Sequence, residues 1–207
     1  MRKTILGLSI VGLCISGGQA QACDGSNIIF EDKFEDDAGG WSIKETIEVR
    51  DGAFVFTLPP DDLQSNLNVT FTLKDADICA EAVWPESGDQ PMLGAALLFW
   101  GENNRTYYQF GILNNGRFWI SRKQDGAWFG TIVANIPSPA INTTPGSSNT
   151  LRVDAKGDSL EFYINGTKVR ALRGQSPSGG WRFGLSGDNF DKMKDATVLF
   201  TNMKVTD

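Results

Sequence analysis

The chain of 207 residues contains 19 basic residues, 25 acidic residues and no histidine. This acidic balance argues against nucleic acid and anionic membrane surfaces as partners, because both attract positive charge. The absence of histidine excludes Ser-His-Asp and Cys-His catalysis and also His-ligated zinc.

The first 22 residues have the pattern of a secretory signal peptide. Arg2 and Lys3 precede an apolar run at 5–15, and small residues follow up to Ala20-Gln21-Ala22. The apolar run has about half of the roughly 20 residues that cross a bilayer, so we expect no stable membrane insertion. Without this leader, 17 of the 19 basic residues remain against 25 acidic ones, and the formal charge becomes −8. The sequence therefore predicts a periplasmic or secreted protein.

Two cysteines, Cys23 and Cys79, remain after removal of the leader. Export permits a disulfide between them, which would tie the N-terminal segment to an early strand. One alternative is a chance pair with a buried thiol. A second is a lipoprotein in which Cys23 carries the lipid, but Ala20-Gln21-Ala22 lacks the leucine-like residue that such a site favours. We predict the disulfide.

Beyond the leader, short alternating runs separated by turn residues continue to the end of the chain. Asp51-Gly52, Asn115-Gly116, Asp125-Gly126 and Asn165-Gly166 provide hairpin turns. No run of helical length shows a 3.6-residue period. The sequence thus predicts an all-β protein with one β-sandwich domain over 23–207. The expected strands are 28–34, 46–50, 53–58, 67–73, 77–84, three runs within 94–129, and then 131–136, 150–155, 159–164, 167–172, 184–187 and 197–205.

The stretch 94–129 has an unusual aromatic row on the face opposite its regular core. Successive side chains of a strand alternate between faces, so inward-facing Phe99, Phe110 and Ile120 direct their neighbours outward. In 77–84 the same rule places Glu81 away from the core, and we expect it to share the face of the aromatic group. The predicted ligand-binding residues are Glu81, Trp100, Tyr107, Gln109, Arg117 and Trp119.

Carbohydrate binding is the function that this set favours. A sugar presents an apolar C–H face and a ring of hydroxyls, so its site needs flat aromatic surface beside amide, carboxylate or guanidinium groups. Trp100, Tyr107 and Trp119 would provide the surface, and either Trp128 or the loop 101–105 would form a rim. Two alternatives stay open: the row is a second packed layer, or its exposed aromatics anchor a protein partner.

Carboxylate catalysis is a further alternative, as in glycoside hydrolases that need two carboxyl groups across a cleft. The nearest pairs are Asp77 with Glu81 and Glu81 with Glu86, and Pro85 interrupts the second. We therefore predict no catalytic residue and no cofactor. A structural calcium is the remaining alternative, with loop carboxylates as ligands, although no contiguous loop has the full ligand pattern. The candidate calcium ligands are Asp32, Asp36, Asp188 and Asp191.

Several motifs resemble those of bacterial concanavalin A-like jelly-roll domains, including the 3-keto-disaccharide hydrolase and laminin-G-like families. They are FEDKF at 30–34, GW at 40–41, YYQFGI at 107–112, GRF at 116–118, DGAW at 125–128, NTLRV at 149–153 and FYING at 162–166. The resemblance implies two stacked antiparallel sheets, one of them concave, with glycan binding on the concave face. The chain lacks the Glu-x-Asp-x-x-Glu-like cluster that glucanases of this fold carry on one strand.

Overall fold

A computed structural model describes residues 23–87 and 90–207, so the predicted signal peptide lies outside the described residues. Within these ranges every regular element is a β-strand, and all strand pairs are antiparallel. The all-β prediction is confirmed. In the described part of the chain there is no helix long and apolar enough to cross a membrane.

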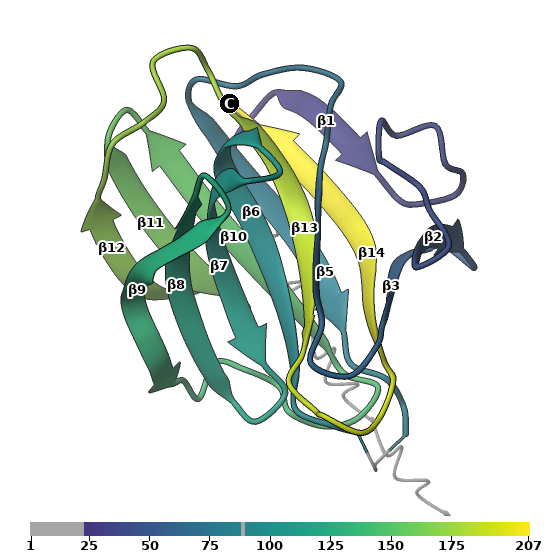
Figure 1. The fold of residues 1–207 in the computed structure, drawn as a ribbon. Helices are drawn as coiled ribbons and strands as arrows, with labels where there is room; N and C mark the ends of the chain where they lie inside the picture. Colours follow the sequence, from purple (N-terminus) through teal and green to yellow (C-terminus); the bar gives the residue numbers. More distant parts are fainter. Residues whose placement is uncertain (1–22, 88–89) are drawn as a thin grey trace, which may run out of the picture.

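The strands form an eight-stranded and a six-stranded sheet, stacked as Figure 1 shows. The eight-stranded sheet contains β1 (Ile28–Asp32), β2 (Ile47–Arg50), β3 (Ala53–Leu58), β5 (Ala76–Val83), β10 (Ser148–Lys156), β11 (Ser159–Ile164), β12 (Thr167–Arg173) and β14 (Ala196–Thr206). The six-stranded sheet contains β4 (Leu63–Leu67), β6 (Leu93–Asn103), β7 (Thr106–Leu113), β8 (Arg117–Gln124), β9 (Ala127–Pro137) and β13 (Arg182–Asn189).

The strand order mixes distant parts of the sequence, as expected for a jelly roll. The larger sheet runs β12-β11-β10-β5-β14-β3-β2, with β1 also paired to β14, and the smaller runs β4-β13-β6-β7-β8-β9. The inward faces of both sheets meet in an aromatic core. Phe162 of β11 lies 5.6 Å from Phe99 of β6 and 5.1 Å from Phe110 of β7, measured between ring centroids.

The predicted strands match the observed ones in order, although β9 and β13 are longer than predicted, and the one misplaced strand lies near residue 67. The predicted strand 67–73 is wrong in position, because β4 spans Leu63–Leu67 and only Leu73 makes a further isolated bridge, to Trp181. Asp61 has a φ of 54° and turns the chain directly after Pro59-Pro60. The strand therefore starts sooner after the prolines than the apolar pattern indicated.

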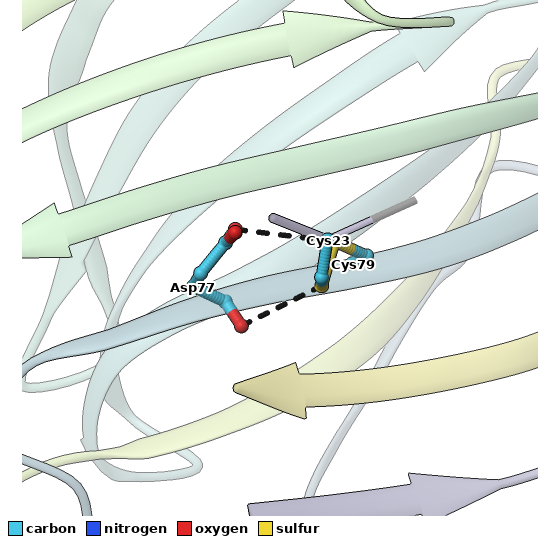
Figure 2. A group of neighbouring side chains, drawn as sticks. All are labelled: Cys23, Asp77 and Cys79. Carbon is cyan, nitrogen blue, oxygen red and sulfur yellow. Dashed lines mark hydrogen bonds between the residues drawn. A yellow bond between two sulfur atoms is a disulfide. The ribbon is translucent and has the colours of Figure 1, made fainter. Parts of the chain in front are cut away.

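Cys23 and Cys79 form the predicted disulfide, with their Cα atoms 5.8 Å apart. Figure 2 shows Asp77 beside it, with its backbone oxygen 3.6 Å from the Cys23 sulfur and its Oδ1 atom 3.9 Å from the Cys79 sulfur. These are contacts and not hydrogen bonds, because a disulfide sulfur carries no proton. Arg152 Nε lies 2.8 Å from Asp77 Oδ1, and the Asp24 amide donates to Asp77 Oδ2 at 2.8 Å. The N-terminal segment is thus held to β5 by the disulfide and by the Asp24 amide hydrogen bond, and the buried Arg152–Asp77 ion pair links β10 to β5.

Candidate functional site

A cleft of about 440 Å³ lies over the outer face of the six-stranded sheet, on the side away from the core. Side chains from β4, β6, β7, β8, β9 and β13 or the residues next to them reach it. Its lining is Leu63, Met92, Gln109, Leu113, Trp119, Ser121, Trp128, Gly130, Thr131, Ala134, Asn135, Asp188 and Phe190.

Trp119 forms part of the cleft floor, because two glycines leave room for its indole against the sheet. A Cβ atom on Gly111 would lie 2.3 Å from Trp119 Cη2, and one on Gly94 would lie 2.8 Å from the same atom. No real Cβ contact is that short, so the indole covers these two backbone positions. Trp119 is 8% exposed and contacts Ala96 and Leu113, while its outer surface lines the cleft.

A buried amide and a buried carboxyl group lie beside Trp119. Gln109 Nε2 donates to Asp188 Oδ2 at 3.0 Å, and both side chains are almost wholly buried. The amide oxygen Gln109 Oε1 and the second carboxyl oxygen Asp188 Oδ1 have no hydrogen-bond partner among the described residues. Buried polar atoms are normally paired, so this pair has unused hydrogen-bonding capacity at the floor of the cleft.

Burial raises the pKa of Asp188 from 3.8 to about 7. The hydrogen bond from Gln109 acts in the opposite direction, the negative charge of Asp62 adds to the rise, and the positive charge of Lys123 lowers it. Near neutral pH, Asp188 therefore exists in both the protonated and the ionised form. It is able to donate a hydrogen bond in the first form and only to accept in the second.

Tyr107, Lys123 and Trp128 form one row across β7, β8 and β9 at one end of the cleft. The Lys123 ammonium lies 5.6 Å from the centre of the Tyr107 ring and 5.5 Å from that of Trp128. The two rings meet edge to face, with centroids 6.2 Å apart. Tyr107 is fully covered, whereas Trp128 is 46% exposed and lines the cleft.

Trp100 does not lie on this face, and its predicted orientation is wrong. It has a φ of 48°, and the register between β6 and β7 shifts directly after Phe99. Such a bulge adds a residue to one strand and interrupts the alternation, so two successive side chains turn to the same side. Trp100 is 1% exposed and packs in the core, 5.3 Å from the Tyr108 ring and 5.9 Å from the Phe99 ring.

Glu81 and Arg117 also lie apart from the cleft lining. Glu81 belongs to β5 of the other sheet, where its Oε2 atom accepts a hydrogen bond from the Thr201 hydroxyl at 3.0 Å. The expectation that it shares the aromatic face is therefore wrong. Arg117 is exposed at the start of β8 and donates from Nε to the Asn135 carbonyl at 2.7 Å, near the cleft edge. Of the six predicted residues, Gln109 and Trp119 meet in the cleft, with Tyr107 beside them.

The candidate carboxylates are dispersed over the molecule. Asp188 is the one acidic residue among those described in the cleft lining, so neither of the nearest carboxylate pairs in the sequence, Asp77 with Glu81 or Glu81 with Glu86, contributes to it. Of the candidate calcium ligands, Asp32 and Asp36 line one surface pocket, where Asp32 accepts a hydrogen bond from Trp41 Nε1. Asp191 lies elsewhere and accepts from the amides of Met193 and Lys194.

In the described ranges, one group of three side chains brings potential metal-ligating atoms within 4.8 Å of one another, namely Cys23, Asp77 and Cys79. Both of its sulfurs are used in the disulfide, so the group has no thiolate to offer a metal.

The cleft residues that were not predicted as saccharide contacts include Met92, Asp188 and Phe190. The pattern in β13 places Phe183 and Leu185 in the core, so Ser186 and Asp188 face outward. Extending the predicted strand 184–187 by one residue would have identified Asp188. Nothing in the local pattern marks Met92 or Phe190, because each lies just outside a strand.

Comparisons with solved structures show the same fold in carbohydrate-related proteins. The carbohydrate-binding module CBM66 from Bacillus subtilis is 17% identical with a TM-score of 0.63, covering 81% of this chain and 96% of the module. The Bacillus licheniformis beta-glucanase is 10% identical with a TM-score of 0.61, covering 86% of this chain and 97% of the glucanase. The laminarinase catalytic domain from Thermotoga maritima is 11% identical with a TM-score of 0.62, covering 89% of this chain and 99% of that domain.

A search of curated proteins found no match. A family profile described as "3-keto-alpha-glucoside-1,2-lyase-like domain" matches residues 25–205, which is nearly the whole described chain. The motifs in the core and turns had indicated a group that includes this family. The protein therefore belongs to the 3-keto-alpha-glucoside-1,2-lyase-like domain family.

Proposed function

We propose that the cleft over the six-stranded sheet binds a saccharide and leaves its bonds unchanged. The observation that carries this proposal is the Gln109–Asp188 pair, whose two remaining oxygens have no partner among the described residues and which lies beside the Trp119 indole. An aromatic surface next to an amide and a carboxyl group suits the apolar face and the hydroxyls of a sugar.

The rest of the lining supports this function. Ser121, Thr131 and Asn135 add polar atoms, and Trp128 adds a second aromatic surface at the rim. An open cleft of this kind binds weakly, with an expected dissociation constant from micromolar to millimolar, or about −4 to −8 kcal/mol. The family and the fold agree with a carbohydrate ligand, but they do not specify which sugar is bound.

Trp128→Ala tests the proposal with little risk to folding, because this side chain is half exposed. A glycan array with the mature protein should identify a ligand, and calorimetry should show at least about tenfold weaker binding by this variant. Phe129→Ala is the matched control: Phe129 is 70% exposed on the same strand and lies outside the cleft lining. Equal loss in both variants, or no glycan signal at all, would contradict the proposal.

A second candidate function is catalysis with Asp188 as a general acid or base. A pKa of about 7 suits proton transfer near neutral pH, and the family description names a lyase. Hydrolysis by two carboxylates is less well supported, because Asp188 is the one carboxylate described in the lining. Product formation from any bound oligosaccharide, lost in Asp188→Asn while binding persists, would select this function. Unchanged substrate after prolonged incubation would support binding without catalysis.

We further propose that the protein is exported and cleaved before Cys23. The Cys23–Cys79 disulfide supports export, because such bonds persist in oxidising compartments. N-terminal sequencing of the protein from periplasmic and culture fractions should start at Cys23. A chain that keeps residues 1–22 would contradict the cleavage.

A further inference from the structure

One end of the cleft is built from apolar side chains alone, except for the buried carboxyl group of Asp188. We call Leu63, Met92, Leu113 and Phe190 the apolar end. Leu63, Asp188, Gly94 and Leu113 pair in a single row across β4, β13, β6 and β7. Just past this row, the Phe190 amide donates to the Met92 carbonyl at 3.0 Å, which keeps these two residues together.

Polar residues of the lining form a separate row. Gln109, Ser121 and Thr131 pair across β7, β8 and β9, with Trp128 beyond them. Gln109 is four residues from Leu113 along β7, so the two rows are roughly 13 Å apart. Trp119 and the Gln109–Asp188 hydrogen bond lie between them. The cleft lining therefore changes from polar to apolar along its length.

The apolar end is also open to solvent. Met92 and Phe190 are each 44% exposed, although both are large and hydrophobic. Single exposed apolar residues are common on protein surfaces. Two that lie side by side at the mouth of a cleft form an apolar surface, and a ligand that covers this surface is bound more tightly. A sugar alone offers few carbon atoms to cover it, and its hydroxyls would lose water there without a protein partner.

We propose that the ligand is an amphiphilic glycoside, a sugar bearing an aryl or alkyl group that lies on the apolar end. This inference rests on the proposed saccharide binding and specifies its ligand class. The sugar ring lies over Trp119 and within reach of the Gln109–Asp188 pair, and the aglycone extends over Leu113 to Met92 and Phe190. The site discriminates between glycosides by their aglycone, because only an apolar group covers this surface without leaving buried hydroxyls unpaired.

The test compares matched pairs of ligands on the mature protein. Calorimetry is run with the methyl and p-nitrophenyl glycosides of glucose, galactose, mannose and xylose in both anomers, with p-nitrophenol alone as the aglycone control. For the sugar that binds, we expect the p-nitrophenyl glycoside to bind about tenfold more tightly than the methyl glycoside. In Phe190→Ala and in Met92→Ala this preference should fall to about twofold.

Met193→Ala is the matched control, because Met193 is 86% exposed close to Phe190 in sequence and lies outside the cleft lining. It should keep the tenfold preference. Equal affinity for methyl and p-nitrophenyl glycosides would overturn the inference and leave saccharide binding intact. Binding of p-nitrophenol as tight as that of its glycosides would overturn it too, since the sugar would then contribute nothing. Failure of every glycoside to bind would instead overturn the proposed function.

Discussion

Replacement of Asp188 by asparagine tests how strongly the buried carboxyl group at the cleft floor responds to pH. The side chain is almost wholly buried, and burial raises its pKa from 3.8 to about 7. The native state therefore keeps a proton that the unfolded state releases at lower pH. Asparagine has a similar shape, offers an oxygen to the Gln109 amide and does not ionise.

The sign and size of the effect follow from this difference in pKa. Below about pH 4 the group is protonated in both states, and its favourable contribution to stability is fully present. As pH rises to about 7, the unfolded state is ionised while the native state resists ionisation, so stability is lost. At about 1.4 kcal/mol per pH unit, the loss reaches about 4 kcal/mol and then stays constant above pH 7.

Urea unfolding followed by tryptophan fluorescence, from about pH 4 to about pH 8, measures the free energy of unfolding of both proteins. Asp188→Asn should match the wild type at the acidic end and exceed it by up to about 4 kcal/mol at the alkaline end. Asp195→Asn, at an exposed position before β14, is the control and should show no such trend. A stability difference that is flat with pH, or a variant that is weaker at pH 8, would refute the reasoning.

Two further predictions concern the packing of Trp119 against Gly111 and the disulfide. Gly111→Ala places a Cβ atom 2.3 Å from Trp119, so it should lower the free energy of unfolding by about 1–3 kcal/mol and weaken saccharide binding. Gly179→Ala is the control and should leave the melting curve unchanged, because a Cβ at this position meets nothing within 4 Å. Identical curves for the two variants would contradict the packing of Trp119 against Gly111. The double variant Cys23→Ser with Cys79→Ser should lose about 4 kcal/mol in denaturant titrations, because the bond closes a loop with a sequence separation of 56. Reduction of the wild type should cause the same loss, and an unchanged midpoint would show that the bridge adds nothing to stability.

Much of the fold was predictable because its signals are local. The hairpin residues Asn115-Gly116 and Asp125-Gly126 lie at the turns between β7, β8 and β9, as their tolerance of positive φ indicates. Cys23 and Cys79 are the two cysteines outside the predicted leader, so only one pairing between them was available. Alternation also placed Tyr107, Gln109 and Trp119 on the outer face of their sheet.

Alternation failed where pairing with another strand changed the local geometry. Trp100 was expected to face outward with Leu98, but the bulge after Phe99 turns its side chain into the core. Glu81 does face away from the core, but it does so on the opposite sheet. Parity states which face of a strand a residue occupies, and it contains no information about which sheet that strand joins.

Period-two patterns and turn residues sufficed to establish an all-β chain and most of its strands, and the cysteine count identified its bridge. The cleft itself depended on the tertiary structure. Gln109 and Asp188 are 79 residues apart and meet because β7 and β13 both flank β6. Met92 meets Phe190 because β6 and β13 are paired neighbours. Strand order in a sandwich is set by the packing of both sheets around one core, which involves the whole chain, whereas a strand's own pattern reports only its immediate neighbours.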